Sequence, residues 1–239
     1  SQVNLGIDGE LLAARNPELQ ARVKALPGFS ILQYQMLTAY VLKQKPDSVV
    51  CWISEYDMFY EQQIPANRLR YFATFDQTLQ LSKLIGLKRL WLNRGEMADI
   101  SFACVMSFWK DRDMLRELLI NRLWTPVDIS PGTRQGNEAE HEAFWQHVNM
   151  LKKNIKKTDF VRINFDSFKL FAQAIVASGI KLYVLEGIMH PEAMSAYDPD
   201  GAFRRETRNR LRSMADRMGF CYVDGSQLPA FNTNDFADV

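Results

Sequence analysis

Three short apolar runs, each bounded by turn residues, most constrain what this chain can fold into. The runs are Ser48–Ile53, Ile180–Ile188 and Phe220–Val223, and helical patterns separate them. A continuous apolar run of this length is typical of a strand buried on both faces of a parallel sheet. Strands that alternate with helices predict an α/β fold. We therefore expect a three-layer α/β/α sandwich around a short parallel sheet, with the strands in flavodoxin-like order.

The middle of the chain departs from this alternation. Helical patterns dominate there, and we expect residues 60–158 to form a helical insertion or lid within one domain that spans residues 1–239. A short strand is predicted at Lys88–Leu92. Helices are predicted at Ile31–Lys45 with Ser30 as N-cap, Phe72–Ile85, Ile100–Trp124, Glu138–Ile155, Ser167–Ser178 and Ala202–Met218.

Composition excludes several classes of protein. The 29 basic and 28 acidic residues nearly cancel, so no electrostatic argument for a nucleic-acid partner survives. The odd number of cysteines predicts three small buried hydrophobic residues rather than disulfides or a zinc site. His141 and His147 lie six residues apart, which does not put them on one helical face. We expect no cofactor and no metal.

Ligands of an open parallel sheet bind beyond the carboxyl ends of its strands, so the residues there are the candidates for a site. They are Gly28, Ser54–Asp57, His190, Asp224 and the tail up to Asp238. The basic helix over Ala202–Met218 is predicted to be a solvated outer face.

Four blocks of the sequence resemble SGNH (GDSL-type) hydrolases in their order. SQVNLGIDGELL resembles the segment after the first strand and puts Ser1 at the nucleophile. LPGFSILQYQML resembles the second block, whose glycine, here Gly28, gives a backbone N–H to the oxyanion hole. KPDSVVCWISEYDMF resembles the third block, and FNTNDFADV resembles the approach to an Asp-x-x-His block in which Asp238 is the aspartate. The resemblance covers roughly 140 of the 239 residues, and the middle third lies outside it.

The third block departs from the family pattern of Gly-x-Asn-Asp. It reads Ser54-Glu55-Tyr56-Asp57, so a tyrosine stands where an asparagine side chain would donate to the oxyanion. The catalytic histidine would fall two residues beyond Val239. Because the first residue is Ser1 rather than Met, we expect the chain to be a piece of a longer protein.

The resemblance implies a serine esterase or O-acyltransferase with a Ser-His-Asp triad. Ser1 and Asp238 would be catalytic, and Gly28, Tyr56, Asp57 and His190 would bind the oxyanion or the substrate. The substrate would be a small ester or an acylated carbohydrate. The alternative is an inactive relative that binds carbohydrate or a protein partner, and a regulatory or assembly domain is a third class. A missing N-terminal anchor, or the apolar segment 100–124, would bring the chain close to a membrane, which favours the cell envelope or periplasm.

Overall fold

The computed structural model describes residues 30–60, 63–110, 112, 145–146, 148–150, 152–153, 155, 158–187 and 191–225. Its strands are β1 (Ser48–Ile53), β2 (Lys181–Glu186) and β3 (Cys221–Val223). The helices outside residues 60–158 are α3 (Leu32–Gln44), α4 (Glu55–Phe59), α12 (Asp159–Ala177), α13 (Pro191–Tyr197) and α14 (Ala202–Met218).

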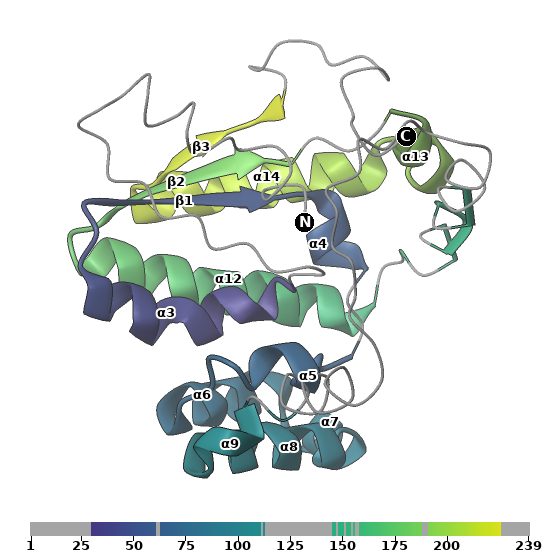
Figure 1. Ribbon diagram of the computed structural model, residues 1–239. Helices are drawn as coiled ribbons and strands as arrows, with labels where there is room; N and C mark the ends of the chain where they lie inside the picture. Colours follow the sequence, from purple (N-terminus) through teal and green to yellow (C-terminus); the bar gives the residue numbers. More distant parts are fainter. Residues whose placement is uncertain are drawn as a thin grey trace, which may run out of the picture.

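The three strands form one parallel sheet in the order β1-β2-β3 (Figure 1). In β1 and β2, Ser48 pairs with Lys181 and Ile53 with Glu186, so the two strands end together. In β3, Cys221 pairs with Tyr183 of β2. Since parallel strands need crossover connections, helices stand between them in the chain. This confirms the α/β fold with a short parallel sheet.

The three long helices α3, α12 and α14 pack against one face of the sheet. Tyr34 of α3 donates to the carbonyl oxygen of Trp52 in β1, and the ring of Phe168 in α12 lies 6.4 Å from that of Phe220, next to β3. Arg208 of α14 reaches Glu186, which points to the same face as Val184 because the two residues are two apart in a strand.

The opposite face of the sheet carries exposed apolar side chains. Val50 of β1 is 61% exposed and its partner Tyr183 is 37% exposed. The expectation that the strands are buried on both faces is therefore wrong: the helices that the structure describes cover one face. A second outer layer of helices stays a prediction.

The cysteine prediction holds for one residue of three. Cys51 points to the helix-covered face and is buried, whereas Cys104 is partly buried. Cys221 is exposed because it lies in register with Tyr183 on the open face of the sheet.

The described residues from 66 to 110 are mostly helical and pack on the far side of α12 from the sheet (Figure 1). The helices there are α5 (Ala66–Leu69), α6 (Phe75–Ile85), α7 (Leu87–Leu92), α8 (Arg94–Val105) and α9 (Ser107–Lys110). That residues 60–158 form an insertion or lid stays a prediction. The strand predicted at Lys88–Leu92 is wrong, because these residues form most of α7.

The bounds of several helices differ from the predicted ones where the local sequence signals are weak. Helix α14 has the predicted bounds, because Gly201 and Gly219 flank it with left-handed backbone. Helix α12 begins at Asp159, eight residues before the predicted start at Ser167. The helix predicted over residues 100–124 is interrupted at Met106, whose backbone is extended between α8 and α9. Helix α13, for which no helix was predicted, begins at Pro191, a residue that suits the first turn of a helix.

Candidate functional site at the carboxyl edge of the sheet

The carboxyl ends of the strands bring polar residues to one edge. β1 is followed by Ser54, β2 ends at Glu186, and β3 is followed by Asp224, and all three side chains are buried. Burial of a polar side chain costs free energy unless hydrogen bonds or an opposite charge compensate for the lost water. The partners of these residues therefore define how the edge is built.

Ser54 and Asp57 form a capping box at the start of α4. The Asp57 carboxylate accepts hydrogen bonds from the Ser54 backbone N–H at 2.7 Å and from the Ser54 hydroxyl at 2.9 Å. The Ser54 hydroxyl oxygen in turn accepts from the Asp57 N–H at 3.4 Å. The removal of water from around its carboxyl group raises the pKa of Asp57 to about 6, against the opposing effect of the hydrogen bonds from Ser54. Ser54 thus serves as the N-cap of α4.

Glu55 is the most buried acid of α4, with 1% of its surface exposed. One carboxylate oxygen, Oε1, accepts a hydrogen bond of 2.6 Å from the hydroxyl of Tyr197 in α13. The other oxygen, Oε2, has no hydrogen-bond partner in the described part of the chain. Burial raises the pKa of Glu55, and the bond from Tyr197 opposes that rise.

Glu186 at the end of β2 binds two arginines of α14. Its carboxylate accepts from Nε of Arg204 at 2.6 Å, from Nε of Arg208 at 2.8 Å and from the backbone N–H of Gly225. Burial raises the pKa of Glu186, but the hydrogen bonds from Arg208, Gly225 and Arg204 outweigh burial and bring its net pKa below the ordinary value. Arg212, one turn further along α14, pairs in the same way with buried Asp224. The arginines of α14 at this spacing therefore attach it to the strand ends. The prediction of a solvated basic face is wrong for Arg204 and Arg208, whereas Arg212 is exposed.

Gly187 follows β2 at a point where no side chain fits. A Cβ atom there would lie 2.7 Å from Nε1 of Trp52 and 2.9 Å from Cβ of Ser54. These distances are shorter than van der Waals contact. Glycine at this position therefore allows the ends of β1 and β2 to approach each other.

Two of the predicted site residues lie at this edge. Tyr56 and Asp57 follow β1 directly; the Tyr56 ring is half-buried and stacks on the ring of Tyr60, with 4.7 Å between centroids. Asp57 performs the capping described above, and its contact with a substrate stays a prediction. Ser1, Gly28, His190 and Asp238 lie outside the described residues, as do His141 and His147.

Sequence reasoning missed the ion pairs of this edge and two of the residues that build it. Glu186 and Tyr197 were not among the candidates, and Glu55 lay in the candidate range Ser54–Asp57 without a role of its own. Two signals could have found the ion pairs: an acid at the end of an apolar strand, and arginines that recur every four residues on one helix face. The second pattern places Arg204, Arg208 and Arg212 on the same side of α14.

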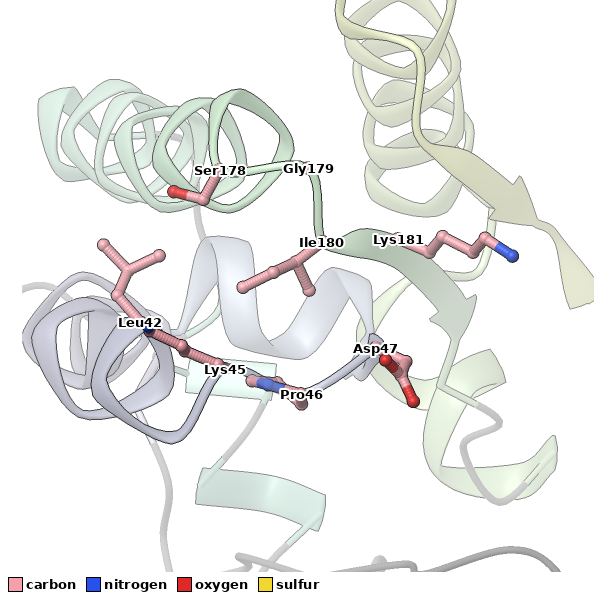
Figure 2. A pocket seen from close by; sticks show the side chains of 8 residues that line it. All are labelled: Leu42, Lys45, Pro46, Asp47, Ser178, Gly179, Ile180 and Lys181. Carbon is pink, nitrogen blue, oxygen red and sulfur yellow. The ribbon is translucent and has the colours of Figure 1, made fainter.

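A hollow of about 790 Å³ lies at the opposite, amino-terminal ends of the strands (Figure 2). Leu42, Lys45, Pro46 and Asp47 line one side, and residues 178–181 line the other. The Lys181 side chain is directed away from it. Because ligands of open parallel sheets bind at the carboxyl ends, we do not place the functional site in this hollow.

Comparisons with protein-family models, with curated proteins and with solved structures give no match to this chain. Among the described residues, no helix has both the length and the apolar character needed to cross a membrane. The same residues contain no group of three or more His, Cys, Asp or Glu side chains placed to hold a metal ion.

Proposed function

We propose that this chain is an SGNH-type serine esterase or O-acyltransferase domain. One observation carries the proposal: the Ser54-Glu55-Tyr56-Asp57 segment directly follows the carboxyl end of a parallel strand. That is the edge where open parallel sheets bind their ligands, and it is the place that the third SGNH block occupies in the resemblance. The remaining site residues enter the proposal through the resemblance alone.

In the proposed reaction, the Ser1 hydroxyl attacks the carbonyl carbon of an ester. A histidine beyond Val239 accepts the hydroxyl proton, and Asp238 orients that histidine. The tetrahedral intermediate then expels the alcohol, which takes the proton back from the histidine and leaves an acyl-serine. Water or a sugar hydroxyl releases the acyl group by the reverse sequence, so hydrolase and transferase share the first half-reaction.

The backbone N–H of Gly28 and the Tyr56 hydroxyl would donate to the oxyanion of the intermediate. Removal of one such donor typically costs about 2.7–4 kcal/mol of barrier. The capping box supports this role, because it fixes the backbone on both sides of Tyr56. The stack on Tyr60 restricts the ring further.

The test is covalent labelling by a fluorophosphonate in a protein that carries this chain with its natural flanking residues. We expect labelling of the wild type, none of Ser1→Ala, and labelling slowed about 100-fold in Tyr56→Phe. The matched control is Tyr40→Phe, on α3, which should label at the wild-type rate. A folded protein that the probe leaves unmodified would refute the proposal.

The alternative function, a binding module for carbohydrate, is favoured by one observation. Tyr56 and Tyr60 form a half-buried pair of stacked rings at the carboxyl edge, and stacked aromatic rings offer a flat apolar surface to a ligand. Calorimetric titration with oligosaccharides tests it. Binding that Tyr60→Ala abolishes, in a protein that the fluorophosphonate leaves unlabelled, would favour the module over the enzyme.

A further inference from the structure

The exposed apolar side chains of this chain gather between residues 66 and 110. Of the thirteen large hydrophobic residues exposed in the described part of the chain, ten lie between Tyr71 and Phe108. Single exposed hydrophobic residues are ordinary in soluble proteins, but a concentration of them in one region marks an interaction surface. Helices α7, α8 and α9 lie at the bottom of the molecule as drawn in Figure 1, farthest from the sheet.

Helix α7 is the most exposed apolar part of this region, and it contains no buried residue. Leu87, Trp91 and Leu92 are 87%, 71% and 68% exposed. Leu87 and Trp91 lie one turn apart and therefore share a helix face. We call these three residues, with Lys88 and Arg94, the α7 surface.

The body of the protein holds α7 in place through other side chains, and one of them, Leu90, packs partly buried against the core. Arg89 forms an ion pair of 2.9 Å with Asp159 at the start of α12, and its guanidinium lies 5.1 Å from the ring centroid of Phe160. These contacts attach the inner side of α7 to α12. The apolar side chains of the α7 surface contribute little to the fold, so their exposure calls for another explanation.

Positive charge accompanies the apolar side chains. Residues 66–110 contain seven basic and three acidic residues, a net charge of +4, whereas the whole chain has +1. Lys83, Lys88 and Arg94 are exposed, and within the described residues they have no ion-pair partner. Arg94 lies over the Trp91 ring, 5.1 Å from its centroid, so a cation and an amphipathic aromatic ring stand side by side.

We propose that the α7 surface binds the surface of an anionic lipid bilayer. Tryptophan and leucine side chains enter the boundary between headgroups and acyl chains, and lysine and arginine beside them attract anionic headgroups. A second copy of the chain fits less well, because a two-fold interface would bring the same positive charges together. The cores of protein interfaces are also depleted of lysine. This proposal is independent of the proposed catalytic function.

The first experiment is co-sedimentation with vesicles of phosphatidylglycerol and phosphatidylcholine, compared with phosphatidylcholine alone. We expect binding to the anionic vesicles to be at least tenfold stronger, and 0.5 M salt to weaken it. Leu87→Ser with Trp91→Ser should lower binding at least tenfold, and Lys88→Glu with Arg94→Glu should remove the preference for anionic lipid. Because α7 buries no residue, these variants should keep the wild-type melting temperature, which circular dichroism checks.

The matched control is Val50→Ser with Tyr183→Ser, which removes two exposed apolar side chains from the sheet instead. It should bind vesicles like the wild type. Brominated lipid should quench tryptophan fluorescence in the wild type and less in Trp91→Phe. Equal binding by all variants, or no binding to anionic vesicles, would overturn the proposal. A dimer in light scattering that Leu87→Ser with Trp91→Ser turns into a monomer, without vesicle binding, would assign the surface to a second copy.

Discussion

Replacement of Glu186 by glutamine tests whether the buried ion pairs hold the carboxyl edge together. The substitution removes a charge from a side chain that is 1% exposed, and it leaves Arg204 and Arg208 without their counter-ion. Loss of one partner from a buried pair typically costs about 3–5 kcal/mol. Both arginine side chains are 24% exposed and regain some hydration, and the glutamine oxygen still accepts one hydrogen bond. We therefore expect a loss of about 2–3 kcal/mol in the free energy of unfolding.

The matched control is Glu206→Gln in the same helix. Glu206 pairs with Arg210 at 2.6 Å, the same distance as between Glu186 and Arg204, but the side chains of Glu206 and Arg210 are 21% and 41% exposed. An exposed pair of this kind contributes about 0–1 kcal/mol. Distance is thus held constant while burial changes.

Urea denaturation measures both variants. With an m value of about 3 kcal/mol/M, Glu186→Gln should lower the midpoint by roughly 1 M, and Glu206→Gln by less than about 0.3 M. Since the pKa of Glu186 is lowered on folding, its contribution is present above the unfolded-state pKa and is lost as the pH falls through the folded-state pKa. The gap between wild type and Glu186→Gln should close in acid. Equal midpoint shifts for the two variants at neutral pH would refute the reasoning.

Three further predictions concern the strand ends and the cysteines. Gly187→Ala should destabilise the protein by about 1–3 kcal/mol, because the new Cβ has no room. Gly95→Ala, in an open stretch of α8, should leave stability unchanged or raise it by up to about 1 kcal/mol. Thermal melting curves of the two variants test this difference. Because folding raises the pKa of Asp57 from 3.8 to about 6, protonation of this carboxyl group favours the folded state. Its contribution to stability is therefore full below pH 3.8 and is lost as the pH rises through about 6. The urea midpoint of the wild type should fall over this pH range, and Asp57→Asn should remove that part of the fall. Iodoacetamide should modify exposed Cys221 in the native protein and spare Cys51, whose thiol pKa burial raises, as peptide mass mapping would show; modification of both at equal rates would contradict the burial.

The sheet was predictable because its signals are local. An apolar run such as Ser48–Ile53 predicts a strand in the interior of the protein, and β1 has these same bounds in the structure. The same run does not indicate which face of the sheet is covered by helices, because Val50, which is exposed, and Cys51, which is buried, are both apolar residues. A strand with one open face therefore has the same sequence pattern as a fully buried strand.

The short strand predicted at Lys88–Leu92 failed for a related reason. Three leucines and a tryptophan around two basic residues fit a strand as well as a helix when the segment is only six residues long. Gly86, with a positive φ of 80°, ends α6 and lets the chain turn into α7. The apolar pattern does not indicate that Leu87, Trp91 and Leu92 of this short helix are exposed to solvent.

The candidate site was predictable only in its position. The rule that ligands meet the carboxyl ends of parallel strands selected the segment that contains Tyr56 and Asp57. It could not select Glu186 or its arginines, because their pairing depends on how α14 crosses the sheet, a property of three-dimensional packing. A basic helix and a buried acid reveal their relation only when both are placed.

The two buried glutamates of this edge differ in a way that their neighbours explain. Against the effect of burial, the hydrogen bonds from Arg208, Gly225 and Arg204 lower the pKa of Glu186. Burial raises the pKa of Glu55, and the charge of Glu186 adds a smaller rise. Glu55 therefore binds a proton more readily of the two, and it shares a hydrogen bond with Tyr197 rather than with a cation. Neighbouring acids whose pKa values are driven in opposite directions can hold one proton in a fixed place. If the proposed site forms at this edge, its anionic intermediate would lie near both acids. The arginines neutralise the charge of Glu186, and Glu55 is more easily protonated. Both effects reduce the electrostatic repulsion between the acids and the intermediate.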